Sequence, residues 1–243
     1  MKTIKGIWRF SRVICYTFVC LFQAYTRFKH VDRKEKGRML RYYPTQVLKL
    51  AGVRCSYEGH VPELLHECGL TDTPPACLVL SNHVSWLDIF SLDSQLPSRF
   101  IAKAEIAKWP IFGLIAQQIG TLFINRSSKR AILRINDDIR GALCNCEAVT
   151  IFAEGTTTFG NELLLIKANF IAPACEIGAT VQPVILSYKN KGKPTKQAAF
   201  SGDVTLFGSL WNVVTMEDAE VVVHFLEPIT NTKDLTRHEV AKI

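Results

Sequence analysis

Apolar runs of strand length alternate along this chain with stretches of helical periodicity. Buried strands are predicted at residues 76–80 and 149–153, further strands at 100–102 and 180–188, and a late strand, possibly at an edge, at 220–226. A strand-like run ends at Arg126. Helices are predicted at residues 31–50, in the stretch that ends near Gly120, and at 127–147 and 169–177. In the clearest helix, apolar residues recur every three or four positions, at Ile132, Ile135, Ile139 and Leu143. Strands that alternate with helices predict an α/β fold with a largely parallel mixed sheet flanked by helices.

The size and composition of the chain favour one catalytic domain. Its 243 residues, 48% of them hydrophobic, are enough to bury one large core. The eight Cys form no C-x-x-C pair, and several of them lie in apolar runs. Because Cys in such runs behaves as a small hydrophobe, we expect neither a metal site nor a disulfide framework. Reduced thiols, as on the cytoplasmic side of a membrane, are the simpler expectation.

Charge changes the picture at the N-terminus. The net charge is +7, but residues 1–50 carry 12 Lys and Arg against 2 Asp and Glu, and residues 51–243 have a net charge of −3. A basic catalytic groove would not have this distribution, whereas a surface that docks on anionic lipid would, since each such cation near the lipid contributes about 1 kcal/mol. No zinc-finger spacing or other recognisable nucleic-acid module accompanies the basic stretch, so we expect no nucleic-acid partner.

The same segment is amphipathic. The apolar run at residues 13–22 is about half the ~20 residues that a spanning helix needs, and basic and aromatic residues flank it. No small-x-small cleavage site follows it, so a cleaved leader is not expected. An interfacial or re-entrant anchor fits these features, and a buried core helix with a solvated charged face is the alternative. We therefore divide the chain into residues 1–50, a membrane-anchoring helical segment, and residues 51–243, the catalytic domain.

The candidate chemistry lies directly after the first predicted core strand, in residues 82–88. His83 is a natural general base near neutral pH, and a carboxylate that accepts one ring N–H would fix its tautomer. Positions i and i+5 do not share a helix face, so His83 and Asp88 meet only if the chain turns and a helix opens near Trp86. Alternatively, His83 caps a helix and Asp88 favours its N-terminus. Ser85 is not the expected nucleophile, because no Gly-x-Ser-x-Gly elbow surrounds it.

Four short blocks carry a resemblance to a known family. Residues 82–88 resemble the Asn-His-x4-Asp signature of the glycerolipid acyltransferase superfamily. Residues 120–126 resemble its second block, in which an Arg follows an apolar strand. Residues 152–157 resemble the third, usually Phe-Pro-Glu-Gly-Thr followed by Arg or Thr, and residues 181–184 resemble the fourth. The blocks stand in the family order and cover roughly residues 76–190, which makes the resemblance specific at superfamily level.

The resemblance implies catalysis by His83 and Asp88. It also implies a substrate site that includes Asn82, Lys103, Gly120, Arg126, Glu154, Gly155, Thr156, Thr157 and Pro183. Arg126 would hold a headgroup phosphate through parallel N–H bonds, although by itself it also fits a surface Arg. Glu154 would organise its loop, and Thr157 stands where the family often has Arg, so Lys103, or else Lys167, would supply the missing charge. Pro183 would shape the acyl pocket or simply make a turn.

The expected function is that of a membrane-associated O-acyltransferase. The resemblance implies transfer of an acyl chain from acyl-CoA or acyl-carrier protein to the sn-2 hydroxyl of 1-acylglycerol-3-phosphate, giving phosphatidic acid. It implies no cofactor beyond this co-substrate, and a monotopic or peripheral location on the cytoplasmic face of the inner (plasma) membrane. Acylation of lyso-ornithine lipid, hydrolysis of the acyl thioester and a non-catalytic lipid-binding role remain alternatives.

Overall fold

An eight-stranded sheet forms the centre of the molecule. The computed structural model describes residues 2–59, 76–125 and 128–243. The strands are β1 (Val53–Gly59), β2 (Cys77–Ser81), β3 (Arg99–Lys103), β4 (Leu122–Ile124), β5 (Val149–Phe152), β6 (Thr180–Asn190), β7 (Lys193–Pro194) and β8 (Ala219–Phe225). Their order is β1-β8-β6-β2-β5-β3-β4, with β7 paired to β6. The pairs are parallel except those of β6 with β8 and with β7, so the predicted largely parallel mixed sheet is confirmed.

The sheet corrects one prediction and adds a strand that the sequence pattern did not reveal. The strand predicted at 220–226 as a possible edge, β8, lies between β1 and β6. Its central residues Val221, Val222 and Val223 are fully buried, as expected of a strand covered on both faces. On this side of the sheet the edge strand is β1, which was not predicted as a strand. Its mixed run of apolar and charged residues is half exposed, and pairing with β8 is what orders it.

Eight α-helices surround the sheet in the described part of the chain. They are α1 (Lys2–Thr26), α2 (Arg33–Ala51), α4 (Leu87–Asp93), α5 (Phe112–Gln118), α6 (Lys129–Cys144), α7 (Ala172–Ile177), α8 (Leu206–Val214) and α9 (Arg237–Val240). Asp32 caps the start of α2 by accepting from the N–H of Glu35, and Gly52 ends it at φ 76°. Helix α8 was not predicted. Thr205 caps it, and its apolar residues are packed by contacts with α1 that lie far away in sequence.

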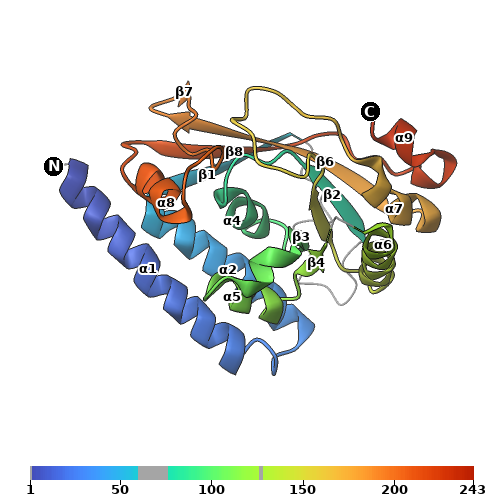
Figure 1. Cartoon of the computed structure of the whole chain (residues 1–243), viewed down its shortest axis with the longest axis horizontal. Helices are drawn as coiled ribbons and strands as arrows, with labels where there is room; N and C mark the ends of the chain where they lie inside the picture. Colours follow the sequence, from blue (N-terminus) through green and yellow to red (C-terminus); the bar gives the residue numbers. More distant parts are fainter. Residues whose placement is uncertain (1, 60–75, 126–127) are drawn as a thin grey trace.

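The core consists of two apolar clusters, one on each face of the sheet. In β2, Cys77 and Val79 face the cluster that contains α1, α2, α4 and α8, whereas Leu78 and Leu80 face the cluster of α6, α7 and α9. This alternation is the period of two expected of a strand. Figure 1 shows the two groups of helices on opposite sides of the molecule. Strand β2 is therefore buried on both faces, and polar groups gather where it ends.

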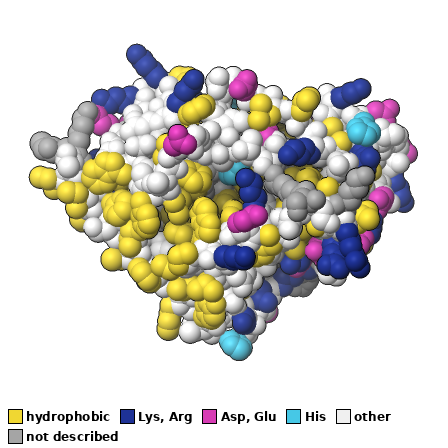
Figure 2. All heavy atoms as spheres, viewed as in Figure 1, with side chains coloured by type: hydrophobic (Ala, Val, Ile, Leu, Met, Phe, Trp, Pro, Cys, Tyr) yellow, Lys and Arg dark blue, Asp and Glu magenta, His cyan; other side chains and the backbone are white. Residues whose placement is uncertain are grey.

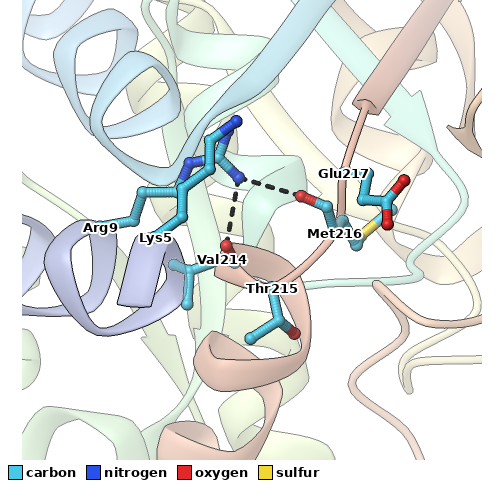
Figure 3. A pocket seen from close by; sticks show the side chains of 6 residues that line it. All are labelled: Lys5, Arg9, Val214, Thr215, Met216 and Glu217. Atoms are coloured by element: carbon cyan, nitrogen blue, oxygen red, sulfur yellow. Dashed lines mark hydrogen bonds between the residues drawn. The ribbon is translucent and has the colours of Figure 1, made fainter. Parts of the chain in front are cut away.

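Helix α1 is attached to the body of the molecule at the end of α8. The Arg9 guanidinium donates to the carbonyl oxygens of Val214, at 3.1 Å, and Met216, at 3.0 Å (Figure 3). It packs so closely over Gly52 that a Cβ there would lie 2.1 Å from the Arg9 Cζ atom. Phe10 meets the ring of Trp211, with the ring centroids 6.2 Å apart. The first helix is thus docked by one buried cation and an aromatic contact.

The outward face of α1 is apolar. Its exposed large hydrophobic side chains are Ile4, Ile7, Trp8, Phe18, Val19, Phe22 and Tyr25. Figure 2 shows a broad hydrophobic area on this side of the molecule. Within the residues that the structure describes, no helix has both the length and the apolar character needed to cross a membrane. The division of the chain at residue 50 stays a prediction, and α2 ends at Ala51 with its buried residues in the same core as β1.

Candidate active site

The end of β2 places His83 and Asp88 together in the way that the spacing predicted. The chain leaves the sheet after Ser81, turns, and enters α4 at Leu87, so that Asp88 lies in the first helical turn. The Asp88 carboxylate then points back at the imidazole, with Oδ2 2.7 Å from His83 Nδ1. Because Nδ1 is bonded to this carboxylate, Nε2 is the ring nitrogen that remains to accept a proton.

Asp88 is fully buried and is surrounded by donors. Its Oδ2 atom also accepts the backbone N–H groups of Val84, at 2.7 Å, and Ser85, at 2.9 Å. Its Oδ1 atom accepts the hydroxyl of Tyr188, which comes from β6. Burial, and then the negative charge of Asp88, raise the pKa of Tyr188 well above its ordinary value, so the phenol stays protonated and remains a donor. A carboxylate with these four donors is well placed to orient an imidazole.

The ring and the backbone of His83 are held by β5 and by the residues that follow it. Its ring stacks on the ring of Phe152, with centroids 3.8 Å apart and planes within 8°. Its backbone N–H donates to Glu154 Oε2 at 2.8 Å, and its carbonyl accepts the N–H of Thr158 at 2.8 Å. The side chain is 20% exposed, so one edge of the ring is open to a substrate.

Glu154 organises the loops around the site. The side chain is buried, and its two oxygens accept the backbone N–H groups of His83 and, at 2.9 Å, Leu164. These contacts agree with the loop-organising role expected for this residue. Ser81 on β2 is level with Phe152 on β5, so the residues that follow both strands meet at one edge of the sheet. Open α/β sheets bind ligands in this position, at the carboxyl ends of parallel strands.

The remaining residues of the Glu-Gly-Thr-Thr block have different surroundings. Gly155 has φ 77°, a conformation that favours glycine, and Thr156 is exposed beside it. The Thr157 hydroxyl donates to the carbonyl of Phe200, so its hydrogen is already used within the protein. Of the two Thr residues, Thr156 is therefore the one whose side chain faces outward. Binding of substrate by these residues stays a prediction.

Asn82 and Pro183 connect the catalytic loop with β6. The Asn82 side chain accepts the Leu186 N–H at 2.7 Å and donates to the Leu186 carbonyl at 3.0 Å. It thus extends the pairing of β2 with β6 by one step beyond the last strand residue. Pro183 is level with Leu80 on β2, and the pairing of β6 with β8 begins at the next residue. Asn82 thus holds the loop that carries His83 against β6, and contact of Asn82 and Pro183 with substrate stays a prediction.

The predicted cations and Gly120 do not all lie at the same ends of the strands. Lys103 is the exposed last residue of β3, so it lies at the carboxyl ends of the strands, as His83 does. Lys167 is exposed as well, and its N–H donates to the carbonyl of Ala153 at 3.1 Å. Gly120 precedes β4 and therefore lies at the amino ends of the parallel strands, away from His83. Its carbonyl there accepts Arg99 Nε at 2.8 Å. The structure does not bring Gly120 together with His83, and Arg126 lies outside the described residues.

Sequence reasoning missed two residues of the site, Phe152 and Tyr188. Both lie inside apolar strands, where aromatic residues ordinarily belong to the core. For Tyr188 the one signal was that a buried phenol needs a hydrogen-bond partner, and the local sequence does not say which group supplies it. Among the residues that the structure describes, no group of three or more His, Cys, Asp or Glu is placed to hold a metal ion.

The fold and the site together define the class of protein. Residues 62–187, more than half of the chain, match the sequence model of the family described as Acyltransferase. The chain therefore belongs to the acyltransferase family of glycerolipid enzymes.

Individual relatives carry two different names. A "Lyso-ornithine lipid O-acyltransferase" from Pseudomonas aeruginosa is 41% identical over 68% of this chain and 63% of its own length. A "1-acyl-sn-glycerol-3-phosphate acyltransferase" from Neisseria gonorrhoeae is 42% identical over 63% of this chain and 60% of its own length. The chain thus spans less than two thirds of each of these relatives. The crystal structure of 1-acyl-sn-glycerophosphate acyltransferase PlsC from Thermotoga maritima has the same fold, with TM-score 0.68 and 18% identity over all of this chain and 92% of that one.

Proposed function

We propose that this chain is a membrane-surface O-acyltransferase that uses His83 as a general base. The observation that carries the proposal is the contact of His83 Nδ1 with the buried carboxylate of Asp88, which leaves Nε2 for a substrate hydroxyl. The two named groups of relatives agree with a lysolipid as the acceptor.

The proposed reaction converts the thioester of the donor into an ester of the acceptor. Nε2 of His83 removes the proton from the acceptor hydroxyl, and the hydroxyl oxygen attacks the carbonyl of acyl-CoA or acyl-carrier protein. A C–O bond forms, the C–S bond breaks, and the imidazolium returns its proton to the leaving sulfur. General-base help of this kind contributes about 10²–10⁴-fold. Holding both substrates together contributes more, with effective molarities of ~10⁵ M or higher.

The acceptor we propose first is 1-acylglycerol-3-phosphate, which would give phosphatidic acid. Arg126, with Lys103 at the open edge of the sheet, would bind its phosphate. The specific observation that favours lyso-ornithine lipid as a second candidate is Thr157, which supplies no cation and whose hydroxyl is bonded to Phe200. A relative named for each acceptor lies at nearly equal identity, so a direct assay must choose between them.

We also propose that the apolar face of α1 rests on the cytoplasmic face of the inner membrane. Two cations lie over exposed aromatic rings of α1, Arg12 on Trp8 and Lys29 on Tyr25. Aromatic side chains with adjoining cations are typical of helices that lie in the membrane interface. This location would bring a lipid acceptor to the enzyme without requiring it to leave the bilayer.

The test is acyl transfer by the full chain from labelled acyl-CoA or acyl-carrier protein on vesicles. The vesicles carry lysophosphatidic acid, lyso-ornithine lipid or no acceptor, and wild type is compared with His83→Ala. His224→Ala is a matched control, because its Nδ1 also faces a carboxylate, Glu58 Oε2 at 3.1 Å, but on β8 and β1.

We expect label in phosphatidic acid, lost with His83→Ala and kept with His224→Ala. Label in the amino lipid alone would show that the acceptor is lyso-ornithine lipid and not 1-acylglycerol-3-phosphate. Free fatty acid formed without any acceptor would identify a hydrolase. No turnover under any of these conditions would contradict the enzyme assignment and favour a lipid-binding role.

A further inference from the structure

The catalytic carboxylate is held from two different strands. His83, Val84 and Ser85 approach Asp88 from the loop after β2, and all three contact the same oxygen, Oδ2. The other oxygen, Oδ1, accepts the hydroxyl of Tyr188 on β6. Removal of this hydroxyl would leave Oδ1 without its donor. Because Asp88 is fully buried, water would not readily replace the donor, and a buried carboxylate oxygen without one is costly.

Tyr188 is held rigidly enough to orient this carboxylate. Its side chain is 5% exposed and belongs to the core, and its carbonyl accepts the N–H of Thr195 at 3.0 Å. Two residues earlier on the same strand, Leu186 is clamped by the Asn82 side chain. Strand β6 therefore contacts the catalytic loop twice, first through the backbone of Leu186 and then through the phenol of Tyr188.

A neighbouring hydroxyl does not duplicate this contact. Ser85 is fully buried, and its Oγ atom lies near the Tyr188 hydroxyl without donating to Asp88. Its contribution to Asp88 is the backbone N–H described above. The donor to Oδ1 is thus a single group that can be deleted without disturbing the backbone.

We propose that Tyr188 is a positioning residue of the acyl transfer, which acts through Asp88 to fix the orientation and the proton affinity of His83. The proposal rests on the proposed function, because it requires His83 to be the base. Tyr188 does not touch substrate in this scheme. Its hydroxyl keeps Oδ2 directed at His83 Nδ1 by engaging the opposite oxygen.

The charges around the pair determine the sign of the effect. Glu154, two residues after β5, faces the backbone of His83, Tyr188 comes from β6, and Cys55 on β1 interacts electrostatically with Tyr188. The phenol donates to the anion and so favours the state in which the pair has released its proton. Removal of this donor raises the proton affinity of the His83–Asp88 pair. The acidic limb of the pH–rate profile then moves to higher pH.

Tyr188→Phe tests this assignment with Tyr57→Phe as the matched control. The Tyr57 hydroxyl is partly buried and contacts Ser94 Oγ at 2.6 Å, so its removal leaves Asp88 untouched. For Tyr188→Phe we expect kcat about tenfold lower, in line with the loss of one hydrogen bond to a charged group, with KM for both substrates within about twofold. We expect the acidic limb of kcat/KM to move up by roughly 0.5–1 pH unit. Tyr57→Phe should show neither change.

A second readout separates the failure of this inference from that of the proposed function. NMR titration of the His83 imidazole, assigned with His83→Gln, reports its pKa whether or not the chain transfers acyl groups. A higher His83 pKa in Tyr188→Phe, but not in Tyr57→Phe, supports the positioning role. An unchanged His83 pKa overturns it, as does a loss of rate without any movement of the pH profile. A wild type that is inactive, with His83→Ala equally inactive, overturns the proposed function instead.

Discussion

Two buried carboxylates on one short helix differ in the hydrogen-bond donors that surround them. Asp88 and Asp93 both lie in α4 and are almost completely inaccessible. Asp88 accepts from four groups, including the imidazole. Asp93 accepts the N–H of Ser98 at 3.0 Å, and burial raises its pKa well above its ordinary value despite that bond. The two buried carboxylates thus differ in the number of donors that they accept.

At this scale we predict that Asp93→Asn stabilises the protein near neutral pH. Because the folded-state pKa of Asp93 is raised, its contribution to stability is full below the unfolded-state pKa of about 3.9 and is lost as pH rises through the folded-state value. Asn retains an oxygen for the Ser98 N–H and carries no charge to desolvate. Thermal unfolding of both proteins at pH 4 and pH 8 checks this.

The Tm values should be close at pH 4, with the variant higher at pH 8. A variant that is less stable than wild type at pH 8 would show that the Asp93 carboxylate is better accommodated than its single donor indicates.

At the scale of the element, helix α8 owes its position to a side chain from the other end of the sequence. Arg9 in α1 donates to the carbonyl oxygens of Val214 and Met216, at the C-terminal end of α8, where a helix favours positive charge. Directly before α4, Trp86 Nε1 donates to Ser209 Oγ at 3.2 Å, which fixes α8 from its other side. The helix therefore joins the N-terminal segment to the element that carries Asp88.

We predict that Arg9→Met destabilises the protein by about 1–3 kcal/mol, because two buried carbonyl oxygens lose their donor. Arg12→Met is the control, since Arg12 is exposed and contacts Trp8 with its guanidinium carbon 4.0 Å from the ring centroid. Its loss should cost at most about 1 kcal/mol. Chemical denaturation of the three proteins gives the free energies of unfolding, and equal losses for the two variants would refute a capping role for Arg9.

At the scale of the whole molecule, hydrophobic side chains gather on the side of α1, away from α6 (Figures 1 and 2). Phe207 and Trp211 on α8 are partly exposed and adjoin Phe10 on α1, so α8 extends the apolar face. This asymmetry is a property of the assembled fold, because α1 and α8 are about 200 residues apart in sequence.

We predict that Phe18→Ser combined with Phe22→Ser weakens binding to anionic vesicles by about tenfold or more, since each substitution removes an aromatic side chain worth up to about 1.5–3 kcal/mol when buried. Leu133→Ser, at a side chain that is 66% exposed on α6, is the control and should bind like wild type. Vesicle sedimentation at two salt concentrations measures both. Equal binding by wild type, the double variant and Leu133→Ser would show that α1 does not contact the membrane.

The local sequence predicted much of the fold and the central pair of the site. Apolar runs of strand length identified β2, β5 and β6, and a helical period identified α6, because burial leaves a trace in the order of residues. The spacing of His83 and Asp88 required a turn between them, and the structure contains it. Strand β1 and helix α8 were not identified, since their partners lie far away in sequence and their own patterns are mixed.

The sequence by itself determined an α/β fold with a largely parallel sheet, the turn that joins His83 to Asp88, and the concentration of positive charge in the first 50 residues. These follow from local periodicity and composition. Only the tertiary structure decided that β8 is internal, that Gly120 lies at the amino ends of the parallel strands, and that Tyr188 completes the surroundings of Asp88. The reason is physical: strand order and cross-strand hydrogen bonds depend on which segments pack together, and residues 100 positions apart carry no local sign of their contact.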